Sequence, residues 1–250
     1  MITDELIEGM AAKCLLTDDE FDDVISTGRG KRIQTVNLHH LALAASSDEF
    51  TRTIEQADYV TADGWPIVRL LRSHGVDAQR VTGSEFVARM LGSRKFHGKK
   101  AAILGADRMV GHAFRGKLHD SGLHVVFREH GDRASWRPAE LAAELESEHV
   151  DLLIVAVTPP YGDAIGEQVR QAGFCGVVVN VGGAVNMAAG AVSMAPAWVR
   201  ATKIEWLYRL ALEPRRLWRR YIIECLPVFA RHVLPSYVRR AEKKVTSAAS

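Results

Sequence analysis

DLLIVAVT, at residues 151–158, is the stretch of sequence on which the fold depends. It is short, rich in branched apolar residues and followed by two prolines, which is typical of a strand buried in a parallel sheet. AAILGA (101–106) and GVVVNVGG (176–183) have the same character, and each contains glycine at or near its end. Three runs of this kind predict neighbouring strands of one parallel sheet.

Segments of helical length separate and follow these apolar runs. They cover residues 109–121, 138–148 and 161–172. Strands that alternate with helices in this way are typical of an α/β fold with a parallel sheet.

The N-terminal part of the chain continues the alternation. RIQTVN (32–37) predicts a strand, residues 38–57 predict a helix, and DYVTADG (58–64) predicts a strand that ends in a turn. We therefore expect an α/β body, a Rossmann-like open sandwich on a parallel sheet. Ligands of such a fold bind at the carboxyl ends of the strands.

The charge of the chain is unevenly distributed. Of its 250 residues 47% are hydrophobic, which is enough for a full core, and the net charge is only +2. Residues 200–250 hold 12 Lys and Arg against 4 Asp and Glu, which leaves 20 against 26 in the remainder. A segment of charge +8 on a body of charge −6 predicts an anionic partner: a membrane surface, a phosphate-bearing substrate or nucleic acid.

The composition changes most sharply near residues 196–201, where Ala- and Gly-rich sequence gives way to basic sequence. We therefore expect an α/β domain at 1–200 and a basic, amphipathic helical appendage at 201–250. No run of about 20 apolar residues is present, which argues against a spanning helix, and the acidic N-terminal sequence does not resemble a signal peptide. Three widely spaced cysteines suggest a reducing cytoplasm.

Three polar residues lie at the carboxyl ends of predicted strands or directly after them. Asp63 stands in TADG, and an Asp-Gly pair is common in turns for structural reasons alone. A carboxylate at the carboxyl end of a strand is also where an α/β enzyme can hold a general base. Thr35 and Asn37 are candidates to hydrogen-bond a ligand at the same edge. The alternative is that they cap the helix that begins near Leu38.

Gly182 and Gly183 follow the last predicted strand. Two glycines there allow a backbone to approach a diphosphate or a sugar closely, although a tight structural turn is the alternative. The ten histidines form no metal-binding motif, so we expect no metal site.

EWLYRLALEPRRLWRRY (205–221) concentrates arginine and aromatic residues in the C-terminal region. Pro214 predicts the start of a second helix, on which Arg216, Arg219 and Arg220 share a face. Guanidinium groups suit bidentate recognition of phosphate, and aromatic residues beside basic ones are typical of a helix in a membrane interface. A solvated basic face is the alternative, but the combination favours a membrane-facing, diphosphate-binding segment.

Together these motifs resemble the WecG/TagA/CpsF glycosyltransferase family. The resemblance covers the chain in order from about residue 32 to residue 221. It rests on TVN (35–37), ADG (62–64), RVTGSEF (80–86), LLIVAV before the prolines, the glycine pair 182–183, Ala-Pro at 195–196, and above all EWLYRL…EPRR…RR.

This resemblance implies an inverting, metal-independent glycosyltransferase that needs no cofactor. It would move a sugar from a UDP-sugar to a polyprenyl-diphosphate-linked sugar during surface polysaccharide assembly, on the cytoplasmic face of the membrane. Asp63 would be the general base that deprotonates the acceptor hydroxyl. The expected substrate-binding residues, which include the glycine pair, are Thr35, Asn37, Arg80, Gly182, Gly183, Arg209, Arg216 and Arg219. We expect no nucleic-acid partner, and the resemblance leaves a homo-oligomer open.

The sequence departs from the family pattern in two loops. TPPYGD (158–163) stands where the family has a PKQE-like motif, and Val185-Asn186 replaces a Phe-Asp pair. These changes leave the identity of the sugar open. They also leave open a weakly active or inactive member. Two rival hypotheses remain: an inert protein that binds a sugar nucleotide or a partner, and an unrelated α/β domain whose basic C-terminal region binds nucleic acid.

Overall fold

The chain folds around one parallel sheet. The computed structural model describes residues 2–129, 133–193, 195–196, 198–199, 202 and 204–237. Within them, seven strands pair in the order β1-β3-β2-β7-β6-β4-β5, and all neighbouring pairs are parallel. The expected α/β fold is confirmed. The strands are β1 (Cys14–Leu15), β2 (Arg32–Val36), β3 (Tyr59–Ala62), β4 (Lys100–Gly105), β5 (His124–Glu129), β6 (Leu152–Ala156) and β7 (Val177–Asn180).

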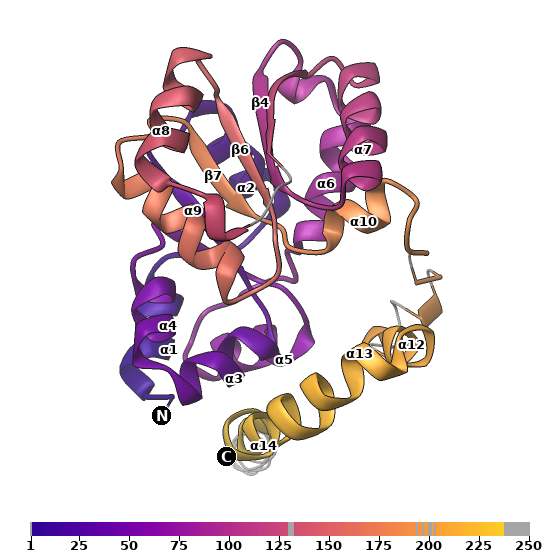
Figure 1. The fold of residues 1–250 in the computed structure, drawn as a ribbon. Coiled ribbons are helices and arrows are strands. Elements are labelled where there is room, and N and C mark those ends of the chain that lie inside the picture. Colours follow the sequence, from indigo (N-terminus) through magenta and orange to yellow (C-terminus); the bar gives the residue numbers. More distant parts are fainter. Residues whose placement is uncertain are drawn as a thin grey trace.

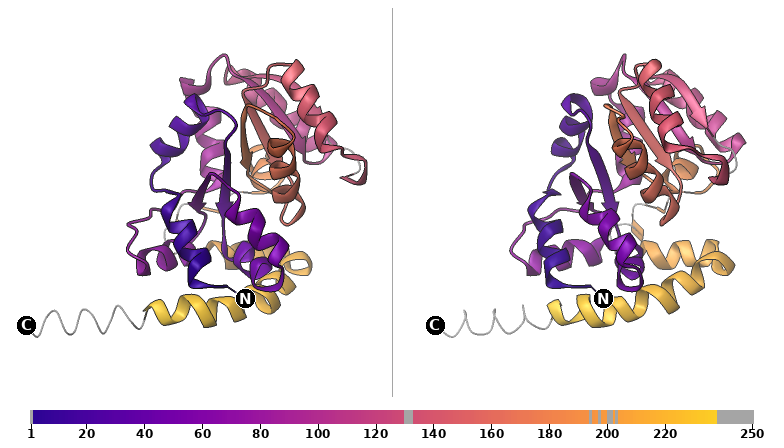
Figure 2. Two further views of the ribbon diagram at one scale, coloured as in Figure 1. Left: turned by 90° about the vertical axis from the view of Figure 1, so that its left-hand side faces the viewer. Right: turned by 60° about the vertical axis from the view of Figure 1, so that its left-hand side comes forward.

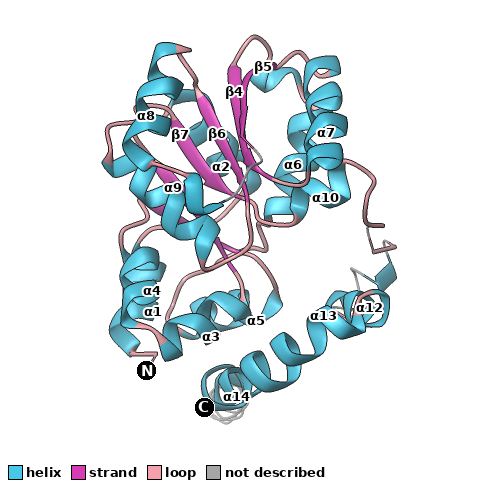
Figure 3. Cartoon of the chain, in the orientation of Figure 1, coloured by secondary structure: helices cyan, strands magenta, loops and turns pink. Residues whose placement is uncertain are grey.

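Helices cover both faces of the sheet (Figures 1 and 3). One face carries α2 (Asp18–Thr27), α6 (Gly83–Gly92), α7 (Arg108–Asp120) and α10 (Ala184–Ala188). The other carries α1 (Asp4–Ala12), α3 (Leu38–Ser46), α4 (Asp48–Glu55), α5 (Trp65–Ser73), α8 (Pro138–Ser147) and α9 (Tyr161–Gln171). Two single 3-10 turns are η1 (Arg94–Phe96) and η2 (Arg133–Ser135).

The strands β4, β6 and β7 are mainly apolar because both of their faces are buried. Side chains alternate between the two faces of a strand. In β6, Leu152 and Ile154 therefore pack in the core with α6 and α7, whereas Leu153 and Val155 pack in the core with α8 and α9. A strand that faces two cores appears in the sequence as an unbroken apolar run, which is why residues 151–158 predict this fold.

The helix expected over residues 38–57 is two helices, α3 and α4. The backbone of Ser47 is extended, and its hydroxyl accepts a hydrogen bond from the Phe50 amide at 3.2 Å. A serine in this position satisfies an amide at the start of a new helix, so α4 begins at Asp48 instead of continuing α3.

The C-terminal segment is a chain of short helical elements that lies across α3 and α5 (Figure 2). It consists of α12 (Glu205–Leu212), α13 (Pro214–Trp218), the π-helix η3 (Arg219–Cys225), α14 (Leu226–Val228) and the π-helix η4 (Phe229–Val233). A helix starts at Pro214, as the sequence predicts. Cys225 and Val228 are buried in the core that α3 and α5 share. The segment is therefore packed onto the body.

The division of the chain at residue 200 stays a prediction. The boundary falls where residues 194, 197, 200, 201 and 203 lie outside the described residues, as do residues 238–250 of the expected appendage. No helix in the described part of the chain has both the length and the apolar character to cross a bilayer.

Candidate active site

A cavity of about 550 Å³ lies at the carboxyl ends of β2, β3, β6 and β7, and the C-terminal segment forms one of its walls. This is the edge of the sheet at which ligands of such folds bind. Eight of the nine predicted site residues line it. They are Thr35, Asn37, Asp63, Arg80, Gly182, Gly183, Arg209 and Arg216.

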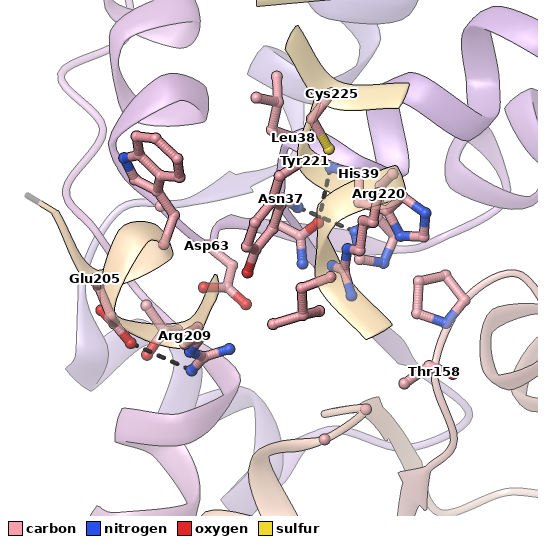
Figure 4. Close-up of a pocket in the computed structure, with 18 of the residues that line it drawn as sticks. Asn37, Leu38, His39, Asp63, Thr158, Glu205, Arg209, Arg220, Tyr221 and Cys225 are labelled. Atoms are coloured by element: carbon pink, nitrogen blue, oxygen red, sulfur yellow. Dashed lines mark hydrogen bonds and ion pairs between the residues drawn. The ribbon is translucent and has the colours of Figure 1, made fainter. Parts of the chain in front are cut away.

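Asp63 directly follows β3, and its carboxylate points into the cavity (Figure 4). The turn is held by the Asp63 amide, which donates to the Val36 carbonyl at the end of β2, 2.8 Å away. Burial raises the pKa of Asp63 to about 6, although the positive charge of Arg209 in particular opposes this change. A carboxylate with a pKa near neutrality can both take up and release a proton, as a general base must.

Thr35 and Asn37 line the cavity beside Asp63, but they have different local partners. Asn37 caps α3, since its side-chain oxygen accepts a hydrogen bond from the His39 amide at 3.0 Å. The Thr35 hydroxyl donates to the Asn180 carbonyl of β7 at 2.8 Å and so takes no part in the cap. The capping alternative is thus correct for Asn37 and wrong for Thr35, and both side chains still face the cavity.

Gly182 and Gly183 form the turn after β7. Gly182 has φ +52°, a conformation that favours glycine, and a side chain on Gly183 would meet no atom within 4 Å. The turn alternative therefore holds at Gly182, while Gly183 leaves open space beside the cavity.

Four arginines line the cavity, and three of them have acidic partners. Arg80 pairs with Glu85, Arg216 pairs with Glu213, and Arg209 Nη2 lies 3.2 Å from Glu205 Oε1. Arg220 forms no ion pair with a described residue, and its buried Nε has no hydrogen-bond partner among them.

Burial lowers the pKa of Arg220, and the positive charges of Arg209 and Arg216 add to this effect. The Arg220 guanidinium lies over the Tyr221 ring, but a buried guanidinium without an anionic partner is costly unless a ligand supplies negative charge. This wall of the cavity is therefore suited to an anion.

Arg219 is exposed and is not part of the cavity lining, whereas its neighbour Arg220 is. Both share a face with Arg216 in the sequence pattern, so the pattern does not distinguish them. They lie in η3, where the backbone is π-helical, and only the packing of this helix on α3 determines which side chain faces inward.

His39 joins the body to the C-terminal segment. Its Nε2 lies 3.0 Å from Oε2 of Glu224 in η3. Burial, together with the nearby Arg220, lowers the pKa of His39 to about 3, so the ring is neutral at physiological pH. A carboxylate accepts hydrogen bonds, and Nε2 must therefore carry the proton and donate it to Glu224.

A buried polar network lies beneath the cavity, and the sequence pattern did not point to it. The fully buried Arg32 donates from Nε to Glu167 Oε2 at 2.7 Å and from Nη1 to Gln34 Oε1 at 2.6 Å. Gln34 Nε2 in turn donates to Asp163 Oδ1 at 2.6 Å. Asp163 is the residue of this hydrogen-bond network that lines the cavity, where His40 also lies.

In the described part of the chain, no group of three or more His, Cys, Asp or Glu residues is arranged to hold a metal ion.

The chain is also similar in sequence to known proteins. Residues 11–243 match the model of the glycosyl transferase WecG/TagA/CpsF family. An N-acetylglucosaminyldiphosphoundecaprenol N-acetyl-beta-D-mannosaminyltransferase of Staphylococcus aureus (strain MRSA252) is 26% identical over 200 residues, which are 79% of this chain and 77% of that protein. The protein of the same name from Bacillus subtilis (strain 168) is 25% identical over 207 residues, 82% of this chain and 79% of that protein.

Proposed function

Since the chain belongs to the WecG/TagA/CpsF family and is a glycosyltransferase, we propose that it transfers a sugar from a UDP-sugar, with inversion, to a polyprenyl-diphosphate-linked sugar. The names of the relatives contain a diphosphoundecaprenol acceptor and an N-acetylmannosaminyl group, which supports this class of acceptor and an N-acetylhexosamine donor. One observation carries the proposal: Asp63, with a pKa of about 6, faces a cavity that is also lined by four arginines.

The proposed reaction is a single displacement. Asp63 accepts the proton of the acceptor hydroxyl, and the oxygen attacks the anomeric carbon of the donor sugar. The bond between that carbon and the diphosphate oxygen breaks, and its electron pair leaves with UDP. Attack from the side opposite to the leaving group inverts the anomeric centre. A positioned carboxylate of this kind contributes about 10²- to 10⁴-fold to the rate.

The negative charge that develops on UDP needs a cationic environment. Arg209, Arg216 and Arg220 line the wall formed by the C-terminal segment, and Arg80 lines the cavity from the body. We assign the stabilisation of the leaving diphosphate to these groups. Arg219, which is exposed, is assigned to the phosphates of the membrane surface.

The acceptor is anchored in a membrane, and the C-terminal segment has the surface of a membrane-binding element. Large apolar side chains of the described residues are exposed mainly there, next to exposed arginines. We propose that this segment lies on the cytoplasmic face of the membrane, with its apolar side chains at the level of the headgroups. Among the exposed apolar side chains of this segment, Leu207, Trp218 and Ile223 do not line the cavity.

The proposal is tested by a panel of UDP-sugars assayed with a short-chain polyprenyl-diphosphate-linked N-acetylhexosamine as acceptor. Transfer from at least one donor is expected, and Asp63→Asn should lower kcat by about 10²-fold or more while UDP still binds. The variant keeps the size of the side chain, so its binding of UDP is the control for folding. UDP binding without transfer by the unmodified protein would favour the rival hypothesis of an inert sugar-nucleotide-binding protein.

A further inference from the structure

We propose that Asp163 recognises a hydroxyl group of the sugar nucleotide. The free carboxylate oxygen of Asp163 accepts a hydrogen bond from this hydroxyl. The inference deepens the proposed function, because it assigns a specificity-determining residue to the same cavity. It rests on the geometry of Asp163 itself and needs no knowledge of which sugar is transferred.

Asp163 is held rigidly, with one of its two oxygens unused. Its side chain is 3% exposed, it lies in the first turn of α9, and it lines the cavity. Oδ1 accepts the hydrogen bond from Gln34, whereas the buried Oδ2 has no hydrogen-bond partner among the described residues. Buried carboxylate oxygens without a donor are rare because each costs free energy of desolvation. A ligand that donates to Oδ2 would remove this cost.

No donor of the described residues lies within hydrogen-bond distance of Oδ2. An arginine can only donate, so the bond from Arg32 Nη1 fixes Oε1 of Gln34 on the arginine side and its amide nitrogen on the Asp163 side. Arg32 also donates from Nε to Glu167 and from Nη2 to the carbonyl of Thr53. The orientation of the Asp163 carboxylate is thus set from below, and Oδ2 is left as the free atom.

His40 is the nearest candidate partner, and it is too far away. Its Nε2 lies 3.7 Å from Asp163 Oδ2, beyond hydrogen-bond distance, and 3.2 Å from Gln34 Nε2. The Asn37 amide points at the other ring nitrogen, Nδ1, at 3.1 Å. A neutral imidazole has only one acceptor nitrogen, so it cannot accept from both Asn37 and Gln34. Since Nδ1 accepts from Asn37, the proton of the neutral ring is on Nε2, and this donor reaches Asp163 Oδ2 only at 3.7 Å, beyond hydrogen-bond distance.

A second buried acceptor lies in the same lining. Asn180, 3% exposed at the end of β7, donates from Nδ2 to the Gly162 carbonyl at 2.7 Å, while its Oδ1 has no described partner. A carboxylate and an amide oxygen, both without donors, repel phosphate and match neutral O–H groups. The arginine-rich wall and this pair of acceptors thus divide the cavity between the anionic and the neutral parts of a sugar nucleotide.

The chemistry of Asp163 predicts that a ligand with this hydroxyl is preferred to the deoxy analogue that lacks it. Removal of the group that donates to a buried charged acceptor costs roughly 10- to 100-fold in kcat/KM, because the carboxylate is again left without a donor. The hydroxyl belongs either to the transferred sugar or to the ribose of the nucleotide. Both present the same chemistry, and the experiment distinguishes them.

The experiment compares the unmodified chain with Asp163→Asn, using the donor, single-deoxy analogues of it, and UDP with and without the ribose 2′-hydroxyl. Binding is measured by calorimetry and, where transfer occurs, kcat/KM by turnover. Glu167→Gln is the matched control, since it removes a carboxylate from the same network, one helical turn away, and Glu167 is not part of the cavity lining. Circular dichroism verifies folding, and Asp163→Ser replaces Asp163→Asn if that variant does not fold.

We expect one deoxy analogue to bind the unmodified protein roughly 10- to 100-fold more weakly, and this ratio to become about threefold or more smaller in Asp163→Asn but to stay unchanged in Glu167→Gln. If Asp163→Asn lowers the affinity ratio between UDP and its 2′-deoxy analogue, the hydroxyl belongs to the ribose. If Asp163→Asn lowers only the ratio between the full donor and a deoxy-sugar analogue of it, the hydroxyl belongs to the transferred sugar. Equal ratios in the unmodified protein and in Asp163→Asn would overturn the inference. Binding without transfer would refute the proposed function alone, because the binding ratios still decide the role of Asp163.

Discussion

The Nε2 atom of His39 in α3 lies 3.0 Å from Oε2 of Glu224 in η3, and this hydrogen bond links the body to the helix that carries Arg220. We predict that Glu224→Ala makes the C-terminal segment open more often, while Glu224→Gln does not, because an amide oxygen still accepts from Nε2. Since the Glu224 side chain is 43% exposed, the effect is at most about 1 kcal/mol. Amide hydrogen exchange over residues 205–237 measures it, and equal exchange in both variants would contradict the role of the bond.

The pH dependence of transfer follows from Asp63. Its pKa of about 6 means that the carboxylate is protonated below that pH and cannot accept the proton of the acceptor. We predict that kcat/KM falls about tenfold for each pH unit below 6 and levels off above about 7. The profile should be measured with a soluble acceptor at constant ionic strength. A flat profile between pH 5 and 7.5 would exclude Asp63 as the base.

The same pKa predicts how stability changes with pH. In the folded chain Asp63 holds its proton up to about pH 6, whereas the unfolded chain releases it near the ordinary value of 3.8. The stability contributed by this group is therefore greatest below about pH 4 and is lost as the pH rises through 6. Asp63→Asn should match the unmodified protein near pH 4 and be more stable at pH 7.5, by up to about 3 kcal/mol.

Urea denaturation at the two pH values measures this difference. Comparing the two chains at each pH cancels other titrations, among them that of His39, whose pKa is lowered to about 3. A difference between the chains that does not change with pH would contradict the assignment.

The fold could be predicted from the sequence where burial is complete. β4, β6 and β7 contain unbroken apolar runs, because each is covered on both faces, whereas the buried strand β2 also carries polar residues. β1 has only two residues, and β5, HVVFRE, is an edge strand with polar residues, so neither has this signal. The break between α3 and α4 depends on a single capping residue, Ser47, which a periodicity argument overlooks.

Part of the site could be predicted from the positions of its residues at the ends of strands. Thr35 lies near the carboxyl end of β2, Asn37 follows β2 and Asp63 follows β3, and the topology of a parallel sheet brings such positions together. Arg220 and Asp163 depend on tertiary packing instead. Which arginine of η3 turns inward is decided by the docking of that helix on α3, and the free oxygen of Asp163 is decided by Gln34 and Arg32. No local pattern contains this information.

The two neighbouring arginines of η3 should have separable roles. Arg220 lines the cavity with its Nε unpaired, and Arg219 is exposed. We predict that Arg220→Gln lowers kcat by about 10-fold or more with a water-soluble acceptor, because the leaving diphosphate loses a cation. Arg219→Gln should leave this rate unchanged and lower the affinity for anionic vesicles. The reverse result would place Arg219 at the diphosphate, as the family resemblance alone implies.

The exposed apolar surface of the C-terminal segment should be needed for membrane binding and dispensable for chemistry. Trp218 and Ile223 are about half exposed and are not part of the cavity lining, so their replacement leaves the site intact. Burial of an apolar side chain contributes about 1.5–3 kcal/mol, and a partly buried one contributes less. The double change Trp218→Ser and Ile223→Ser should therefore weaken binding to anionic vesicles roughly tenfold or more and spare transfer to a soluble acceptor.

Met109 supplies the control for that experiment. It is 78% exposed on α7 of the body, so Met109→Ser removes an exposed apolar group outside the C-terminal segment and should leave vesicle binding unchanged. Flotation at low and high salt separates the two contributions to binding, because salt weakens the attraction of arginine to headgroups but not the burial of apolar groups. Tight, salt-sensitive binding to duplex DNA without flotation would instead favour a nucleic-acid partner, since DNA binding depends mainly on phosphate contacts and needs no exposed tryptophan or isoleucine.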